Sequence, residues 1–222
     1  MKKILFNDKF GLTQAVLDGR KTMTRRICKY DRPNEDYDIV FPVFEPNDYD
    51  NDGNITSPLN YAFGWKNKEG DFTGWNIPKY KVGEVVAIAQ SYKDLGYHAI
   101  GLDRSPKDYR IVRGTLGQSK GWNNKMFVRS EACKHHIRIT NVKIERLQDI
   151  SDDECFREGI RKWTKDEELF KYDLSDGFEM FKWQDKPRTP REAFAALIDK
   201  VSGKGTWNNN PYVFAYEFQL ID

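Results

Sequence analysis

The chain has 222 residues, 39% of them hydrophobic, which is enough for one decorated domain or two small ones with a sizeable core. Charged residues make up 32% and aromatic residues 14%, a composition that excludes a largely disordered chain. No apolar run approaches the roughly 20 residues that span a bilayer, and no signal-peptide core follows Met1, so we expect no membrane partner. The three cysteines are odd in number and far apart, which favours a reducing, cytoplasmic location over a disulfide framework.

The formal net charge is only +2, but the charges are unevenly distributed. Residues 1–30 contain eight Lys or Arg against two acids, and residues 101–147 contain eleven against four, whereas 31–54 and 148–180 are acidic. If the two basic segments meet in the fold, they form a surface suited to RNA or to a nucleotide phosphate. The alternative is that these charges pair with one another. The near-zero net charge argues against tight nonspecific binding to nucleic acid.

The first 30 residues predict a buried strand, a helix and a second extended segment. Residues 4–6 are apolar throughout, as in a short buried strand. The spacing of apolar residues over 10–17 predicts a helix, and Gly19 suits the left-handed residue that closes one. The extended segment follows directly.

Residues 30–80 are expected to be an insertion, because Pro, Asn, Asp and Gly are plentiful there. Within it, two aromatic segments at 61–65 and 72–75 flank a turn-like segment at 67–70. This pattern predicts a hairpin with aromatic cross-strand pairs.

Further strands are predicted by runs of β-branched and aromatic residues and, near the C-terminus, by strict alternation. A second insertion, residues 92–124, interrupts them. The predicted strands are 83–89, 109–112 inside this insertion, 126–128, 136–144 and 214–220.

Two helices are predicted from their first turns. Ser151 and Glu154 form a capping box, and Gly159 closes the short helix that follows. Thr189 and Glu192 form a second capping box, with proline in the first helical position.

Strands thus dominate, with helices near the start and between the last two strands. We expect an α+β fold built on a small, mostly antiparallel β-barrel with short helices. The whole chain, residues 1–222, is expected to form a single domain with insertions at about 30–80 and 92–124.

The segment from Gly19 to Arg26 combines cations and hydroxyls where a helix gives way to an extended run. Its sequence, Gly-Arg-Lys-Thr-Met-Thr-Arg-Arg, places four cations and two hydroxyls within seven residues. Along an extended run, Thr24 and Arg26 project from one face, while Lys21 needs the turn to join them. Such a cluster suits a phosphate or a polarised carbonyl in a pocket. The alternative is a basic, solvated connection between helix and strand.

Four of these residues carry a resemblance to a known family. Gly19, Lys21, Thr24 and Arg26 form the pattern Gly-x-Lys-x-x-Thr-x-Arg, which resembles the signature of the ASCH domain, a small β-barrel of the PUA-like superfamily. The resemblance implies the same barrel architecture that the strand pattern predicts.

The resemblance covers about residues 1–30, 80–92 and 125–222, and the longer organisation looks closer to phage- or prophage-associated ASCH proteins of unknown activity. It implies a pocket that recognises RNA or a modified nucleoside, so our first functional hypothesis is a non-catalytic binding module. The residues expected to bind the ligand are Gly19, Arg20, Arg25, Arg26 and Trp207.

The chain also partly resembles the small bacterial amidohydrolases that deacetylate N4-acetylcytidine, a subset of ASCH proteins. This resemblance implies catalytic roles for Lys21, Thr24 and Glu158. Lys21, deprotonated by burial or by cationic neighbours, would serve as a base or nucleophile activator. Thr24 would supply the attacking hydroxyl or orient a water, and Glu158 would pass a proton to the departing amine. If Lys21 instead stays charged, it holds phosphate or pairs with Glu158, and there is no catalysis.

Other constellations are weaker. Residues 48–55 match the first eight positions of a calcium loop, but Leu59 stands where a bidentate Glu is needed, so the alternative is a polar turn. Cys133, His135 and His136 lack a fourth ligand at suitable spacing. No phosphate loop or dinucleotide fingerprint occurs. We therefore expect neither metal nor cofactor, and the lack of a His pair or metal cluster counts against a ribonuclease, a third hypothesis.

Several tryptophans in turn-like, Asn- and Gly-rich segments are candidates for stacking on bases. The alternative for most of them is that they cap the barrel ends or pin the insertions. They are Trp65, Trp75, Trp122 and Trp207, of which Trp207 is the candidate to test.

Overall fold

The computed structural model describes residues 1–43, 61–97, 117, 119–164, 167–173, 184 and 186–221. These residues form a mixed α/β fold around a five-stranded sheet with the order β1-β5-β6-β9-β2. β1 and β5 are parallel, and the other neighbouring strands of this sheet are antiparallel. The five strands are β1 (Lys3–Ile4), β2 (Met23–Ile27), β5 (Val85–Ile88), β6 (His136–Arg146) and β9 (Tyr212–Leu220).

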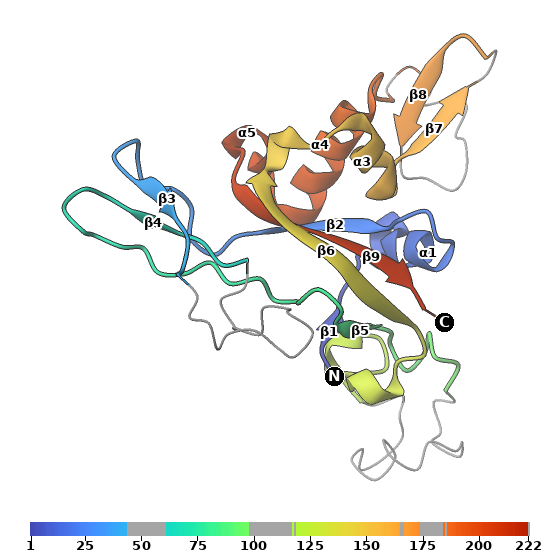
Figure 1. The fold of residues 1–222 in the computed structure, drawn as a ribbon. Coiled ribbons are helices and arrows are strands. Elements are labelled where there is room, and N and C mark those ends of the chain that lie inside the picture. The colour runs from blue at the N-terminus through green and yellow to red at the C-terminus, as the bar shows by residue number, and fades with distance from the viewer. Residues whose placement is uncertain are drawn as a thin grey trace.

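Two smaller antiparallel pairs and several short helices surround this sheet in the described residues. β3 (Asp38–Val40) pairs with β4 (Gly64–Lys66), and β7 (Arg161–Thr164) pairs with β8 (Phe170–Asp173). Figure 1 shows α3, α4 and α5 together beside one end of β6, with β1 and β5 near its other end. The helices are α1 (Leu12–Leu17), α3 (Asp152–Arg157), α4 (Pro190–Ser202) and α5 (Thr206–Asn209), and the 3-10 turns are η1 (Asp8–Phe10), η4 (Lys125–Phe127), η5 (Ser130–Ala132) and η6 (Leu147–Asp149).

The two helices predicted from capping boxes are present. α3 begins at the predicted capping box, in which Ser151 and Glu154 each accept the other's backbone N–H. α4 begins after Thr189, whose hydroxyl accepts the Glu192 N–H at 3.1 Å. The Glu192 carboxylate binds the Arg188 N–H instead of the Thr189 N–H, so only half of that predicted box forms.

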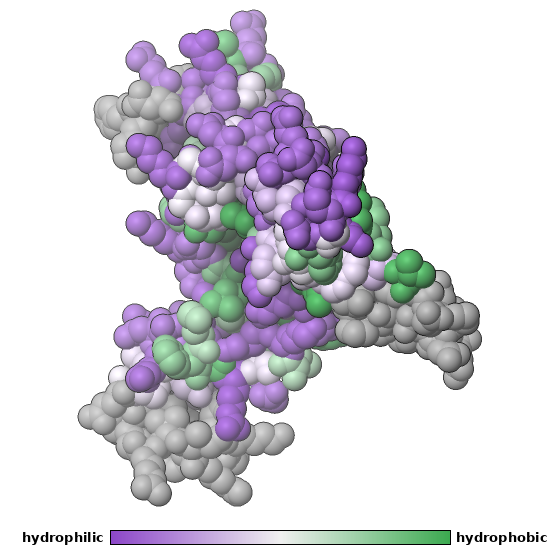
Figure 2. All heavy atoms as spheres, turned by 90° about the vertical axis from the view of Figure 1, so that its left-hand side faces the viewer, coloured by the Kyte–Doolittle hydropathy of each residue, from purple (hydrophilic) through white to green (hydrophobic). Residues whose placement is uncertain are grey.

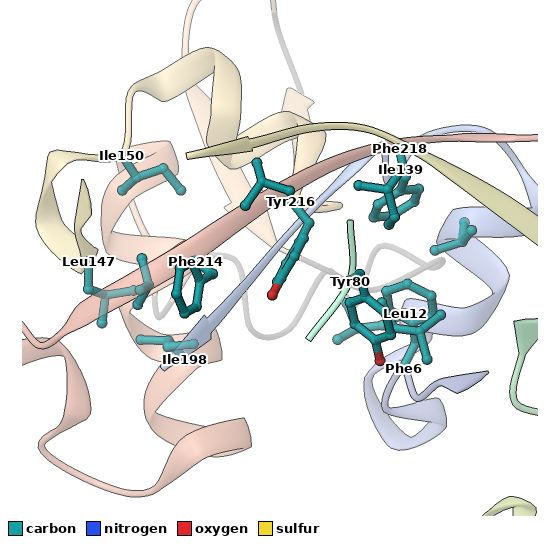
Figure 3. Packing of buried hydrophobic residues seen from close by; sticks show 14 of the residues in the cluster. Phe6, Leu12, Tyr80, Ile139, Leu147, Ile150, Ile198, Phe214, Tyr216 and Phe218 are labelled. Carbon is teal, nitrogen blue, oxygen red and sulfur yellow. The ribbon is translucent and has the colours of Figure 1, made fainter. Parts of the chain in front are cut away.

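The main hydrophobic core lies along β9, as the alternation of its sequence predicts. Phe214, Tyr216 and Phe218 are 5%, 1% and 3% exposed, respectively. Burial of one such side chain stabilises a fold by about 1.5–3 kcal/mol, so β9 contributes heavily to the core. Figure 3 shows Ile198 and Phe214 on one side of Tyr216, and Ile139, Phe218, Tyr80, Leu12 and Phe6 on the other.

The expectation of mostly antiparallel strands with short helices is confirmed, but a closed barrel is not seen. In the described residues, β1 and β2 are the two edges of an open sheet. One side chain bridges the opening: Arg26 Nη2 donates to the Leu5 carbonyl at 2.6 Å.

The prediction of a strand at 126–128 is wrong. Residues 125–127 form the turn η4, because the Asn124 side chain accepts the Met126 N–H and so favours a local turn over pairing.

The first insertion contains a strand pair that differs from the predicted hairpin. Isolated antiparallel bridges join Phe63 to Asn76 and Lys66 to Phe72, while the strand partner of β4 is β3. The predicted strand at 109–112 and the calcium-loop segment lie outside the described residues.

No helix in the part of the chain that the structure describes is long and apolar enough to cross a membrane. Cys28, Cys133 and Cys155 form no disulfide in the structure.

Candidate functional site

Lys21 and Glu158 meet where the chain leaves α1 and α3, although 137 positions separate them. Gly19 has a φ of +72°, which lets the chain turn after α1. The Thr22 N–H then donates to the Arg157 carbonyl at 2.8 Å. This backbone bond ties the segment that carries Lys21 to the end of α3, which carries Glu158.

The Lys21 ammonium is enclosed by acceptors. Its side chain is 2% exposed, and its Nζ lies 2.5 Å from Glu158 Oε2. Nζ also donates to the carbonyls of Met23 at 2.7 Å and of Glu158 at 2.9 Å. These three acceptors match the three N–H donors of a lysine ammonium.

Burial is the main influence on the pKa of Lys21. It lowers this pKa below the ordinary value of 10.5, and the Glu158 carboxylate opposes the effect only in part. The charges of Arg26 and Arg25 lower the pKa further. A lowered pKa makes it easier for the amine to release a proton, as a catalytic base requires.

Arg25 holds Glu158 from its other side. Arg25 Nη1 lies 3.2 Å from Glu158 Oε1, and its Nη2 lies 2.8 Å from Glu154 Oε2. Its Nε donates to Glu145 Oε1 at 2.8 Å. The guanidinium therefore joins β2 to carboxylates of β6 and α3, and its charge is matched within the protein.

Lys143 completes the network of charges. Its Nζ contacts Glu154 Oε1 and lies 2.9 Å from Glu145 Oε2. Burial would raise the pKa of Glu154, but bonds from Lys143 and the Ser151 N–H, with the charge of Arg25, lower it to about 2. The network thus balances three cations, Lys21, Arg25 and Lys143, against three carboxylates, Glu145, Glu154 and Glu158.

A cavity of about 540 Å³ opens beside this network. Thr24 lines it, is 5% exposed, and has a hydroxyl without a hydrogen-bond partner among the described residues. Figure 2 shows a mostly hydrophilic face with hydrophobic residues gathered near its middle. The apolar residues that line the cavity are Leu5, Phe6, Leu12, Ile27, Phe194, Leu197, Ile198 and Val201.

The structure brings most of the predicted site residues together and leaves three outside the cavity. Gly19 is exposed and serves the turn, and Arg20 pairs with Asp18 at 3.1 Å. Trp207 packs against Phe194, with ring centroids 6.1 Å apart, on α5. The predicted residues that line the cavity are Lys21, Thr24, Arg25, Arg26 and Glu158.

Sequence reasoning missed the carboxylates that surround Arg25. Glu145 and Glu154 lie 120 and 129 positions from Arg25 along the chain. In the sequence, the capping box accounts for Glu154 without any further partner. No local pattern links an acid on one element to a cation this distant along the chain.

The described residues contain no group of three or more His, Cys, Asp or Glu side chains placed to hold a metal ion. Cys133 is buried, with its Sγ 3.5 Å from the Arg129 carbonyl, and His136 lies in β6 opposite Ala87.

Comparison of the chain with protein-family models, with curated proteins and with solved structures found no match. The ASCH resemblance therefore stays a prediction.

Proposed function

We propose that the protein is an amidohydrolase that removes the acyl group from the exocyclic amine of an N4-acylated cytidine. The observation that supports this best is the buried 2.5 Å contact between Lys21 Nζ and Glu158 Oε2. The hydroxyl of Thr24 lines the cavity beside it. An amine–carboxylate pair within proton-transfer distance and a hydroxyl without a partner are two of the groups that amide hydrolysis uses.

The chemistry begins with a proton transfer inside the buried pair. Glu158 takes a proton from Lys21, which leaves a neutral amine and a carboxylic acid. The amine then removes a proton from the Thr24 hydroxyl, or from a water that this hydroxyl orients, as the oxygen attacks the acyl carbon. Breakdown of the tetrahedral intermediate transfers a proton from Lys21 or Glu158 to the departing cytidine amine. If Thr24 is the nucleophile, a water then releases the acyl group as a carboxylic acid.

The cavity suits a nucleobase. Its volume of about 540 Å³ falls in the range of small-molecule sites, roughly 300–1,000 Å³. Phe6 and Phe194 are among its apolar lining residues, and Lys21 Nζ lies 5.9 Å from the centre of the Phe6 ring, so a flat ring that packs on Phe6 would lie near the Lys21–Glu158 pair.

The proposal includes membership of the ASCH family, with the PUA-like barrel. The edges β1 and β2 lie close enough for Arg26 to bridge them through the Leu5 carbonyl. An open sheet whose edges approach each other around a cavity is compatible with such a barrel.

A binding module for RNA or a modified nucleoside is the second candidate, and Arg26 favours it. Its guanidinium lines the cavity and has no carboxylate partner within the described segments. Lys21 and Arg25 are instead matched by carboxylates, so the four-cation cluster exerts much less attraction on phosphate than its sequence suggests.

The test is to incubate the purified protein with N4-acetylcytidine and to separate the products by chromatography. We expect the wild type to release cytidine, and Lys21→Ala, Thr24→Val and Glu158→Gln each to lower the rate by about 10²–10⁴-fold. Thr22→Val is the matched control, because the Thr22 hydroxyl accepts from Arg157 Nε at 3.3 Å and does not line the cavity. Circular dichroism checks that each variant is folded.

Absence of cytidine at high enzyme concentration would refute hydrolysis of this substrate and leave the binding module. Full activity of Glu158→Gln would refute the roles assigned to the buried pair.

A further inference from the structure

A second cavity, of about 280 Å³, adjoins the first. The two share three lining residues, Leu5, Arg26 and Ile27, so Arg26 lies at their boundary. The other residues that line the second cavity include two cations, Lys29 and Lys79, and no carboxylate among the described residues.

The walls of this cavity are held by hydrogen bonds. Asn76 is 1% exposed, accepts the Tyr30 N–H and donates to the Tyr30 carbonyl, both at 2.8 Å. The Lys79 N–H donates to the Tyr216 hydroxyl at 2.9 Å. These bonds hold the backbone next to Lys29 and at Lys79, two residues that line the same cavity.

The three cations are available to a ligand. Arg26 uses one N–H of Nη2 on the Leu5 carbonyl, which orients the guanidinium and leaves its other N–H donors without a described partner. Lys29 Nζ lies 4.6 Å from the Tyr30 ring and Lys79 Nζ lies 5.5 Å from the Tyr80 ring. Neither ammonium forms an ion pair with a described carboxylate. A cavity with three such cations attracts an anion.

We propose that the second cavity binds a phosphate group of the nucleotide whose base occupies the first. This inference rests on the proposed function for the identity of the base. Because Arg26 borders both cavities, one ligand reaches both, and the smaller volume accommodates a phosphate with its sugar. The preferred substrate is therefore a phosphorylated cytidine, as a mononucleotide or within an oligonucleotide, which binds more tightly than the free nucleoside that the first cavity alone holds.

The test measures binding of unacylated probes by calorimetry, so that no turnover is needed. The probes are cytidine, cytidine 3′- and 5′-monophosphate, a cytidine trinucleotide and inorganic phosphate, each at about 50 and 200 mM salt. We expect at least one monophosphate to bind about tenfold or more tighter than cytidine, with the gain reduced at high salt.

The double variant Lys29→Gln/Lys79→Gln should lose this gain while it binds cytidine like the wild type. Lys66→Gln/Lys68→Gln is the matched control, because it removes the same charge from exposed residues that line neither cavity. A trinucleotide that binds tighter than both monophosphates would identify an oligonucleotide as the ligand, and equal affinity would identify the mononucleotide.

Equal affinity of the wild type for cytidine and for both monophosphates would overturn the proposal. So would a phosphate-dependent gain that the double variant retains. If N4-acetylcytidine is not hydrolysed but the double variant loses phosphate-dependent binding, the phosphate site stands and the proposed reaction fails.

Discussion

Glu158 contacts two cations at once, and its position explains why both are buried. Its Oε2 pairs with Lys21 and its Oε1 with Arg25, and its side chain is 5% exposed. Loss of Glu158 would take this carboxylate from both buried cations, and removal of one partner of a buried ion pair typically costs about 3–5 kcal/mol. Arg25 thus acts on Lys21 through Glu158: by holding this carboxylate, it fixes the acceptor to which Lys21 can lose a proton.

Glu154 gives the network a measurable dependence on pH. Its pKa is lowered to about 2 in the folded protein from an ordinary 4.5. Between these values the unfolded state binds more protons, so the stability from ionised Glu154 is present above pH 4.5 and is lost as the pH falls toward 2. We expect the melting temperature of Glu154→Gln to fall less steeply than that of the wild type over this window. The measurement is thermal unfolding from pH 7 to pH 2.

The control for this titration is Glu192→Gln at the start of α4. The Glu192 carboxylate accepts the Arg188 N–H and lies outside the buried network. Parallel pH profiles for Glu154→Gln and the wild type would contradict the role assigned to Glu154.

At the scale of elements, the end of α3 determines where Glu158 lies. Gly159 follows it with a φ of +106°, a conformation that residues with a Cβ rarely adopt. A Cβ at this position would lie 3.7 Å from Lys21 Cβ and 3.6 Å from Ala15 Cβ, both ordinary contacts. The strain of a substitution therefore comes from the backbone and acts on the residue that pairs with Lys21.

We expect Gly159→Ala to destabilise the protein by about 1–2 kcal/mol and to lower turnover by roughly 10–100-fold, because it displaces Glu158. Gly70→Ala is the matched control: Gly70 has a φ of +97° with no atom within 4 Å of its added Cβ, in a turn that does not line the cavity. Urea unfolding should show a similar loss for both variants, whereas hydrolysis of N4-acetylcytidine should fall only for Gly159→Ala. An equal loss of turnover in Gly159→Ala and Gly70→Ala would contradict the role assigned to Gly159 in placing Glu158.

Elements with strong local signals could be predicted from sequence, and those made by distant pairing could not. The capping box at Ser151 and the alternation in β9 each act within a few residues, so both predictions hold. β7 and β8 have no comparable signal, because their register depends on pairing across residues 165–169. The turn η4 shows the opposite case, in which Asn124 overrides the β-propensity of the apolar residues after it.

The same division applies to the candidate site. Lys21, Thr24 and Arg26 were found together because they fall within six residues of one segment. Glu158 came only from the family resemblance, and the carboxylates around Arg25 required the fold. The pairing of β6 with β9 and of β9 with β2 carries Glu145 across the sheet to Arg25.

At the scale of the whole molecule, β2, which carries Thr24 and Arg25, is paired to the inner strand β9 of the core sheet. β9 pairs with β2 on one side and β6 on the other, and its side chains form much of the core. The β7–β8 pair lies to one side of this sheet in Figure 1 and pairs only with itself among the described strands. Segments with few buried contacts open at lower free energy than the strands of the core.

Hydrogen exchange should therefore separate these two regions. We expect the hydrogen-bonded amides of β6 and β9 to exchange only through global unfolding, with a free energy that falls steeply with urea. The amides of β7 and β8 should open at a free energy several kcal/mol lower, with little dependence on urea, because local opening exposes little surface. Amides of β2 should follow β9 although β2 is an edge strand, because the ion pairs of Arg25 with Glu145 and Glu154 tie it to β6 and α3. Exchange of β2 at the rate of β7 and β8 would show that the site lies on a mobile edge, and it would contradict the rigid placement of Lys21 beside Glu158.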